Sequence, residues 1–270
     1  MNKPTVVLLG SKPGAVVALE LMLQNNWIVT AVVPSGSHPL IKEESLDKVA
    51  SKSGLPILTQ DELGPEKVDF VISYMCRDKV TPKTLSLAKK AALNFHAGPL
   101  PEYAGWAFYN LAILENAAEY GCTCHHMDDG FDTGPLLEVR RFEIVAAHDT
   151  AVSLERKSQE EMILLFKDFI KMVENGASLP KVPQDSGRMR YLKKQDFEKM
   201  KKIPLDASKE TVQRIARAFF YPPYECAYLE INGTRVEVMP EVAKSEIAER
   251  LHFDDLQKLR NAAGIMRETV

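Results

Sequence analysis

Short runs of apolar, mostly β-branched residues alternate with helix-forming segments along the first third of the chain. This pattern predicts strands at 5–9, 28–33, 56–58, 68–73 and 91–95, separated by helices at about 13–23, 43–52 and 82–90. Strands that alternate with helices form βαβ units and a mostly parallel sheet. Because ligands bind beyond the carboxyl ends of such strands, the residues that follow them are the first candidates for a functional site.

The rest of the chain departs from this alternation. We expect a helix at 106–116, strands at 120–127 and 136–144, a long amphipathic helix at 150–174 and an irregular stretch at 177–207. A helix at 209–219, a hairpin around Asn232-Gly233 and a charged helix at 245–262 follow. The predicted fold is therefore α/β, with a Rossmann-like sheet flanked by helices. We divide it into a catalytic domain, 1–203, and a small C-terminal region of helix plus hairpin, 204–270.

Composition narrows the functional class. The formal net charge is −3 and the pI about 6.1, which argues against a large nucleic-acid-binding surface. No apolar run approaches the roughly 18–20 residues needed to span a bilayer, so we expect a cytoplasmic protein without membrane contact. The four cysteines are too few for a disulfide framework. Cys122, Cys124 and the following histidines lack a metal-ligand spacing, so no metal is predicted.

Three polar side chains stand among turn-forming Gly and Pro residues that can hold them at strand ends. Asn94 and His96 lie at the end of a predicted strand, and Asp132 lies in the Asp-Gly loop between two later strands. An amide can donate to an oxyanion, and an imidazole changes charge near neutral pH and so can move a proton. A carboxylate can orient that imidazole. These are the needs of acyl transfer to an amine.

The pattern Asn-x-His-x-x-x-Leu-Pro-x-Tyr-x-Gly at 94–105, with Asp-Thr-Gly at 132–134, resembles the formyltransferases that use N10-formyltetrahydrofolate. The resemblance covers roughly residues 1–180. It implies that His96 carries the proton of the attacking amine, that Asn94 donates an N–H to the oxyanion, and that Asp132 orients the imidazole and stabilises its cation. His125, in a Thr-x-His segment that also matches, is more readily a hydrogen-bonded support than a reacting group.

The same resemblance suggests how the formyl donor is bound. It places the loop Asp128, Asp129, Gly130 and Phe131 around the pterin ring, although Asp128 and Asp129 could also belong to a solvated turn. The segment that contains Arg77, Lys79 and Val80 matches a part of the family that lines the pterin pocket. Arg77 or Lys79 could instead pair with a substrate phosphate, because each is a cation near the expected cleft. A solvated loop is the remaining alternative.

Two stretches in the last third of the chain, Arg190-Tyr-Leu-Lys-Lys-Gln-Asp-Phe197 and Arg217-Ala-Phe-Phe-Tyr-Pro-Pro-Tyr224, resemble the C-terminal part of nucleotide-sugar N-formyltransferases. Tyr221 and Tyr224 flank two prolines, and such a stiff aromatic turn can stack a nucleobase. It can equally form a small satellite core, and both interpretations stay open. The leading hypothesis is formyl transfer to a nucleotide-linked amino sugar, with a dTDP-linked 4-amino-4,6-dideoxyhexose or its 3-amino isomer as the first candidate, for surface polysaccharides such as O-antigen.

Other interpretations of the sequence remain. The acceptor could be methionyl-tRNA or glycinamide ribonucleotide, or the chain could bind folate or nucleotide without turnover. The family resemblance implies a homodimer, and the edge strands of the C-terminal hairpin could supply the contact.

Overall fold

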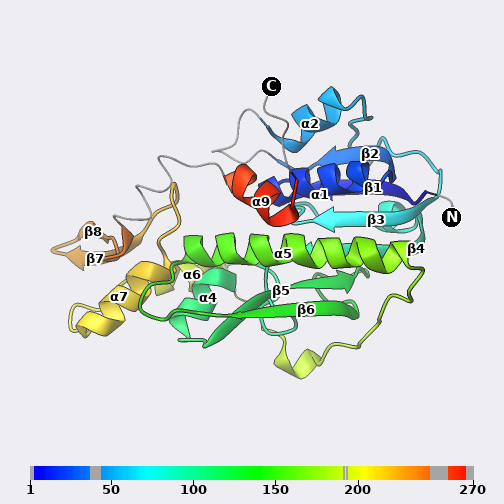
Figure 1. Ribbon diagram of the computed structural model, residues 1–270. Coiled ribbons are helices and arrows are strands. Elements are labelled where there is room, and N and C mark those ends of the chain that lie inside the picture. The colour runs from blue at the N-terminus through cyan, green and yellow to red at the C-terminus, as the bar shows by residue number, and fades with distance from the viewer. Residues whose placement is uncertain are drawn as a thin grey trace.

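The computed structural model describes residues 3–36, 44–106, 108–190, 192, 194–243 and 255–265. Its centre is a six-stranded sheet in the order β2-β1-β3-β4-β5-β6 (Figure 1). Its strands are β1 (Thr5–Gly10), β2 (Ile28–Pro34), β3 (Val68–Tyr74), β4 (Ala88–His96), β5 (Glu119–His126) and β6 (Leu136–Glu143). The first four are parallel to one another, and β5 and β6 add in antiparallel fashion. The predicted fold class is confirmed.

Some helices cover the sheet, and others lie beyond one end of it (Figure 1). They are α1 (Pro13–Gln24), α2 (Leu46–Lys52), α3 (Pro82–Leu85), α4 (Phe108–Leu114), α5 (Ala151–Glu174), the 3₁₀ turn η1 (Ser186–Arg188), α6 (Lys194–Met200), α7 (Lys209–Ala218) and α9 (Asp255–Ala263). Strands β7 (Ala227–Ile231) and β8 (Thr234–Val238) form a separate hairpin. Figure 1 shows α1 and α9 beside the long helix α5, and these three helices pack against one another.

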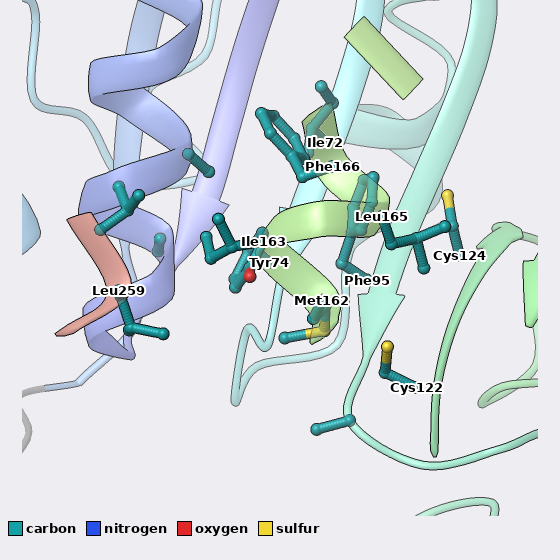
Figure 2. Packing of buried hydrophobic residues seen from close by; sticks show 14 of the residues in the cluster. Ile72, Tyr74, Phe95, Cys122, Cys124, Met162, Ile163, Leu165, Phe166 and Leu259 are labelled. Carbon is teal, nitrogen blue, oxygen red and sulfur yellow. The ribbon is translucent and has the colours of Figure 1, made fainter. Parts of the chain in front are cut away.

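The two faces of the sheet bury different side chains of the same strands. In β1, Val6 and Leu8 belong to the larger core under α1 and α5, whereas Val7 and Leu9 belong to a second core on the opposite face. Figure 2 shows Phe166 of α5 packed against the sheet. Its ring centroid lies 5.9 Å from that of Tyr74 and 4.9 Å from that of Phe95. Helix α5 therefore fixes the ends of β3 and β4.

The predicted helix at 82–90 is wrong over its second half. Helix α3 ends at Leu85, and β4 begins at Ala88, which pairs with Val68 of β3. Lys89 and Lys90 are exposed, so this part of the strand carries none of the apolar alternation that identifies a strand. Pairing with β3 has overridden a local sequence that favours helix.

Two other expectations differ from the structure, and a third is tested only in part. The predicted strand at 56–58 is reduced to one bridge between Ile57 and Val32. The stretch at 177–207, expected to be irregular, contains η1 and α6. Helix α6 escaped prediction because one apolar side chain, Phe197, anchors it, against Trp106 and Phe219. The predicted helix at 245–262 is observed from Asp255 onward as α9, and its residues 245–254 lie outside the described residues.

The C-terminal elements pack onto the main body. Helix α7 lies against α4, and Phe219 at its end is part of the larger core. Arg260 of α9 is almost fully buried, with Nε 2.9 Å from Oε2 of Glu20 and one terminal nitrogen 2.7 Å from Oε2 of Glu44. The boundary at 203/204 and the homodimer remain predictions. No helix in the described part of the chain is long and apolar enough to cross a membrane.

Truncating Phe166 should test the anchoring role of α5. We expect Phe166→Ala to lower the free energy of unfolding by about 3–5 kcal/mol, because it leaves a cavity under β3 and β4. The exposed substitution Val182→Ala is the control and should change it by less than about 0.5 kcal/mol. Urea unfolding measures both, and equal effects would contradict this view of the core.

Candidate active site

Strand register brings the polar residues of β4 and β5 to one face of the sheet. Asn94 is paired with His125, and His96 is paired with Thr123. Their neighbours Phe95 and Cys124 point the other way, into the core under α5. The polar cluster therefore lies on the face opposite α5, at the carboxyl end of the last parallel strand.

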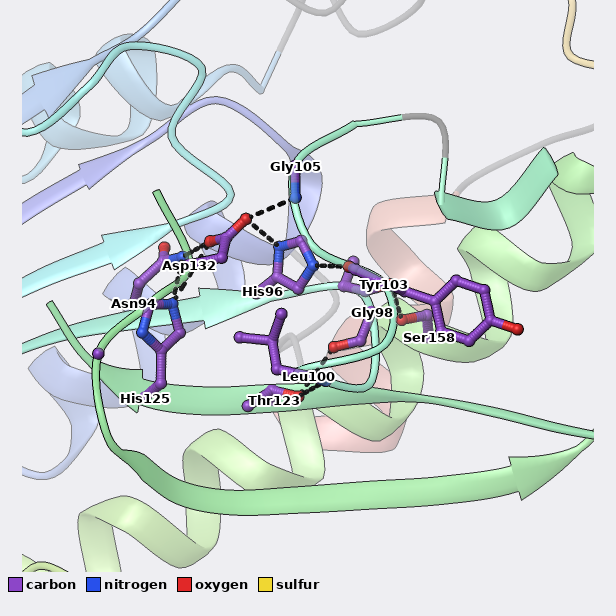
Figure 3. A network of polar contacts seen from close by, with 12 residues as sticks. Asn94, His96, Gly98, Leu100, Tyr103, Gly105, Thr123, His125, Asp132 and Ser158 are labelled. Atoms are coloured by element: carbon purple, nitrogen blue, oxygen red, sulfur yellow. Dashed lines mark hydrogen bonds and ion pairs between the residues drawn. The ribbon is translucent and has the colours of Figure 1, made fainter. Parts of the chain in front are cut away.

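Asp132 completes the cluster from the loop between β5 and β6 (Figure 3). Its Oδ2 is 3.7 Å from Nδ1 of His96, and its Oδ1 is 3.4 Å from Nδ2 of Asn94. The residue has a positive φ of 56°, and Nε2 of Gln184 donates to its backbone oxygen at 2.8 Å. Asn94, His96 and Asp132, predicted from separated motifs, thus lie together.

The carboxyl group of Asp132 is largely buried and still strongly acidic. Burial alone would raise its pKa, but Coulombic attraction to the His96 ring, a hydrogen bond from His125 and the backbone N–H of Gly105 together hold the pKa well below its usual range. The N–H of Gly105 donates to Oδ2 at 2.9 Å. Near neutral pH the site therefore holds an ionised carboxylate beside the His96 ring.

His96 has an acceptor near each ring nitrogen. Its Nε2 is 2.7 Å from the carbonyl oxygen of Tyr103, and because a carbonyl can only accept, this nitrogen carries a proton. Nδ1 faces Asp132 at a distance longer than a hydrogen bond. The ring of Phe108 covers the imidazole edge-on at a centroid distance of 4.8 Å. Nδ1 is therefore the atom that can take up a proton, next to a carboxylate that stabilises the cation.

Asn94 and His125 are bound to each other. Nδ2 of Asn94 is 3.1 Å from Nε2 of His125, whose Nδ1 donates to the backbone oxygen of His126 at 2.9 Å. In the neutral ring Nε2 accepts from Asn94, and in the charged ring it donates to Asp132, 3.5 Å away. The N–H bonds of Asn94 thus face His125 and Asp132. The neighbouring ring, His126, turns away and bonds the backbone oxygen of Pro180.

A cavity of about 490 Å³ opens beyond the carboxyl ends of β1 and β3, the point at which the sheet order reverses. Aromatic side chains form much of its wall, together with cations and carboxylates. Its lining comprises Lys12, Met75, Arg77, Trp106, Phe108, Tyr109, Asn110, Glu155, Lys194, Phe197, Glu198, Lys201, Phe219, Tyr221, Pro222, Pro223, Tyr224 and Glu225. Phe108 joins this cavity to the cluster of Asn94, His96 and Asp132, because it also contacts His96.

One buried cluster fastens the aromatic turn to the first strand–helix loop. Nζ of Lys12 lies 2.8 Å from Oε1 of Glu155 and 3.2 Å from the hydroxyl of Tyr221. That hydroxyl also donates to Glu155. The ring of Tyr221 lies 5.8 Å from that of Tyr224, measured between centroids. The predicted substrate residues Arg77, Tyr221 and Tyr224 all line the cavity, and the hydroxyl of Tyr221 is bonded to Lys12 and Glu155, which line it too.

The residues predicted to bind the formyl donor divide into two groups. Asp128, Asp129, Gly130 and Phe131 form an exposed loop that leads directly into Asp132. Val80 is buried in the second core, beneath the sheet.

Lys79 is not among the cavity-lining residues. Its Nζ donates to the backbone oxygen of Asp129 at 2.6 Å.

Several residues of the site carried no usable signal in the sequence. Lys12 and Glu155 are 143 residues apart in the sequence, and no local motif marks either residue. Gln184, which holds the Asp132 loop, lies in a stretch without periodicity. The contacts made by the backbone of Tyr103 and Gly105 could have been suspected, because both residues belong to the motif at 94–105.

The lowered pKa of Asp132 predicts a pH-dependent contribution to stability. The ionised carboxylate stabilises the fold above the pKa of an unfolded aspartate, about 3.9, and this stabilisation is lost as the pH falls through the folded pKa. We expect the difference in unfolding free energy between the wild type and Asp132→Asn to be larger at about pH 6 than at about pH 3. Urea unfolding of both proteins measures it, and a difference that does not fall on acidification would refute this assignment.

Two proteins of known function that are similar in sequence to this chain are both formyltransferases. A methionyl-tRNA formyltransferase from Latilactobacillus sakei is 25% identical over 248 residues, which cover 87% of this chain and 76% of that protein. A GDP-perosamine N-formyltransferase from Brucella melitensis is 30% identical over 174 residues, or 64% of this chain and 65% of its own.

Two solved structures that are similar to this chain are also of N-formyltransferases. The chain superposes on an N-formyltransferase from Helicobacter canadensis, in complex with folinic acid and dTDP-3-aminofucose, with a TM-score of 0.72, 25% identity and coverage of 86% and 85% of the two chains. It superposes on WlaRD, a sugar 3N-formyltransferase solved with dTDP and 5-N-formyl-THF, with a TM-score of 0.74, 25% identity and coverage of 87% and 85%. Residues 4–167 match the formyl transferase family, and the chain belongs to that family.

Proposed function

We propose that this formyltransferase moves the formyl group of N10-formyltetrahydrofolate to the primary amine of a nucleotide-linked amino sugar. The observation that carries the proposal is the position of the catalytic cluster, which adjoins an aromatic and cationic cavity through Phe108. There the aromatic side chains suit a flat base, the cations suit a negatively charged linker, and His96 suits the sugar amine. Structures of relatives with folates and with dTDP or a dTDP-linked amino sugar support this interpretation.

Proton transfer is assigned to Nδ1 of His96. The acceptor amine attacks the formyl carbon, so that a C–N bond forms and the formyl oxygen becomes an oxyanion. The amine proton passes to Nδ1, because Nε2 already holds a proton against Tyr103, and Asp132 stabilises the resulting imidazolium. When the bond from the formyl carbon to the folate nitrogen breaks, His96 returns this proton to the leaving nitrogen.

Asn94 is assigned as the residue that donates an N–H hydrogen bond to the oxyanion. For this role, one of its N–H bonds must leave its present partner. Its N–H bonds face His125 at 3.1 Å and Asp132 at 3.4 Å. The second contact is the longer and weaker of the two. We infer that this N–H turns from Asp132 to the formyl oxygen as negative charge develops there, which is the behaviour expected of a catalytic hydrogen bond that tightens only in the reacting complex.

The cavity suits a nucleotide better than a bare sugar. Trp106 and Phe197 pack at a centroid distance of 4.8 Å in one part of the wall, and Tyr221 and Tyr224 form another aromatic pair. Tyr221 packs against the larger core and also lines the cavity. Arg77 adds an exposed cation for a phosphate. The loop 128–131 is assigned to the pterin of the formyl donor.

Methionyl-tRNA is the second candidate acceptor, because the L. sakei relative aligns along most of this chain. The net charge of −3 speaks against a large polyanion as acceptor. We expect no formylation of methionyl-tRNA under conditions that formylate an amino-sugar nucleotide.

Replacing the proton carrier tests the reaction. We expect His96→Asn to lower kcat by about 10²–10⁴-fold while the affinity for folate stays nearly unchanged, because the ring moves a proton rather than binding the donor. His148→Asn, at an exposed position, is the matched control and should retain full activity. Mass spectrometry of a panel of dTDP-, GDP- and UDP-linked amino sugars, glycinamide ribonucleotide and methionyl-tRNA reads the gain of one CO. Activity of His96→Asn equal to that of the control would refute the assignment.

Truncating the aromatic turn tests the acceptor site. We expect Tyr221→Ala to raise KM for the amino-sugar nucleotide about tenfold or more, with little change in KM for the formyl donor, because a stacked base is lost. Tyr228→Ala, outside the cavity lining, controls for general effects. Steady-state kinetics with each substrate varied in turn give both constants. Equal changes in the two KM values would remove the stacking claim.

A further inference from the structure

Lys79 connects two loops that are far apart in the sequence. It lies between β3 and α3, and its Nζ donates to the backbone oxygen of Asp129 at 2.6 Å. The same nitrogen lies 5.2 Å from the ring centroid of Phe131, an arrangement in which a cation is attracted to the face of an aromatic ring. Within the described residues, no carboxylate forms an ion pair with Lys79, so its charge is directed to the loop 128–131.

The backbone that carries Lys79 is itself held in place. The side-chain amide of Gln60 donates to the carbonyl oxygen of Lys79 at 3.0 Å and accepts from the N–H of Thr81 at 2.9 Å. The next residue, Val80, is buried in the second core. Because the backbone around Lys79 is held in this way, the side chain starts from a fixed point from which a neighbouring loop can be positioned.

The loop that receives this contact has a firm base and an exposed tip. Oδ1 of Asp128 accepts hydrogen bonds from the N–H of Gly130 at 2.9 Å and from the hydroxyl of Thr133 at 2.6 Å. These bonds close the turn locally. They leave Phe131 at the tip half exposed. The contact from Lys79 reaches this tip from outside the loop, one residue before Asp132.

We propose that Lys79 is a positioning residue that fixes the tip of the loop 128–131 for the formyl donor. This inference rests on the proposed function, which assigns that loop to the pterin. It replaces the alternative in which Lys79 pairs with a substrate phosphate. Arg77, two residues before Lys79 in the same segment, lines the acceptor cavity. In one short segment after β3, Lys79 therefore acts in donor binding and Arg77 acts in acceptor binding.

A variant without the charge should weaken donor binding selectively. Lys79→Met keeps the aliphatic stem and loses both the hydrogen bond and the cation, so we expect KM for the formyl donor and Kd for 5-formyltetrahydrofolate to rise about fivefold. KM for the acceptor and kcat should change less than about twofold. Lys79→Arg keeps a cation that can both donate and stack, and it should restore donor binding to near the wild-type value.

The matched control is Lys83→Met. Lys83 is also exposed, and its Nζ also donates to a backbone oxygen, that of Asp61 at 2.9 Å, but it makes no described contact with the loop 128–131. Hydrogen–deuterium exchange supplies a readout that does not depend on the reaction. We expect the amides of 129–133 to exchange faster in Lys79→Met and to remain unchanged in Lys83→Met.

The outcomes separate this inference from the proposed function. If the wild type does not bind 5-formyltetrahydrofolate, the proposed donor fails, and the positioning of the loop for it fails as well. If the wild type binds but Lys79→Met has unchanged donor affinity and unchanged exchange at 129–133, the donor stands and the role of Lys79 is refuted. A rise in acceptor KM alone would return Lys79 to the phosphate-binding alternative.

Discussion

The carboxylate of Asp132 remains ionised inside the protein because three groups surround it. Burial works against the charge, and the His96 ring, His125 and the N–H of Gly105 outweigh it. Each of these groups comes from a different segment: β4, β5 and the proline-containing loop that follows β4. The position of Asp132 thus depends on the sheet register and on both loops. A shift in any of them would leave a buried charge without its partners, which is costly.

Sheet geometry explains why these groups meet. Side chains alternate between the faces of a strand, so the pairing of Asn94 with His125 places the polar residues on one face and the aromatic anchors Phe95 and Phe166 on the other. The core therefore holds β4 from the face under α5, while the site occupies the opposite face. The aromatic cavity lies at the neighbouring reversal point of the sheet, and Phe108 connects it to the site.

Local patterns in the sequence predicted the sheet and most helices. The family resemblance, and no local pattern, implied that Asn94, His96 and Asp132 lie together, as the structure shows. Predictions failed where a long-range contact decides the local structure. The first residues of β4 have the composition of a helix and become a strand because β3 lies beside them. Lys12 and Glu155 form an ion pair across the domain, and no spacing rule connects them. The partner of Lys79 also depends on the fold, since charge alone suits a phosphate equally well.

The proposed mechanism requires His96 and Asp132 to act as one proton-moving unit, and a double-mutant cycle is its sharpest test. Single-turnover formyl transfer would be measured for His96→Asn, Asp132→Asn and the double variant. If the carboxylate acts through the imidazole, the double variant will be no slower than His96→Asn alone, because residues that act as a unit are non-additive. If the two losses instead multiply, Asp132 acts independently of His96 and the proposed proton transfer is contradicted.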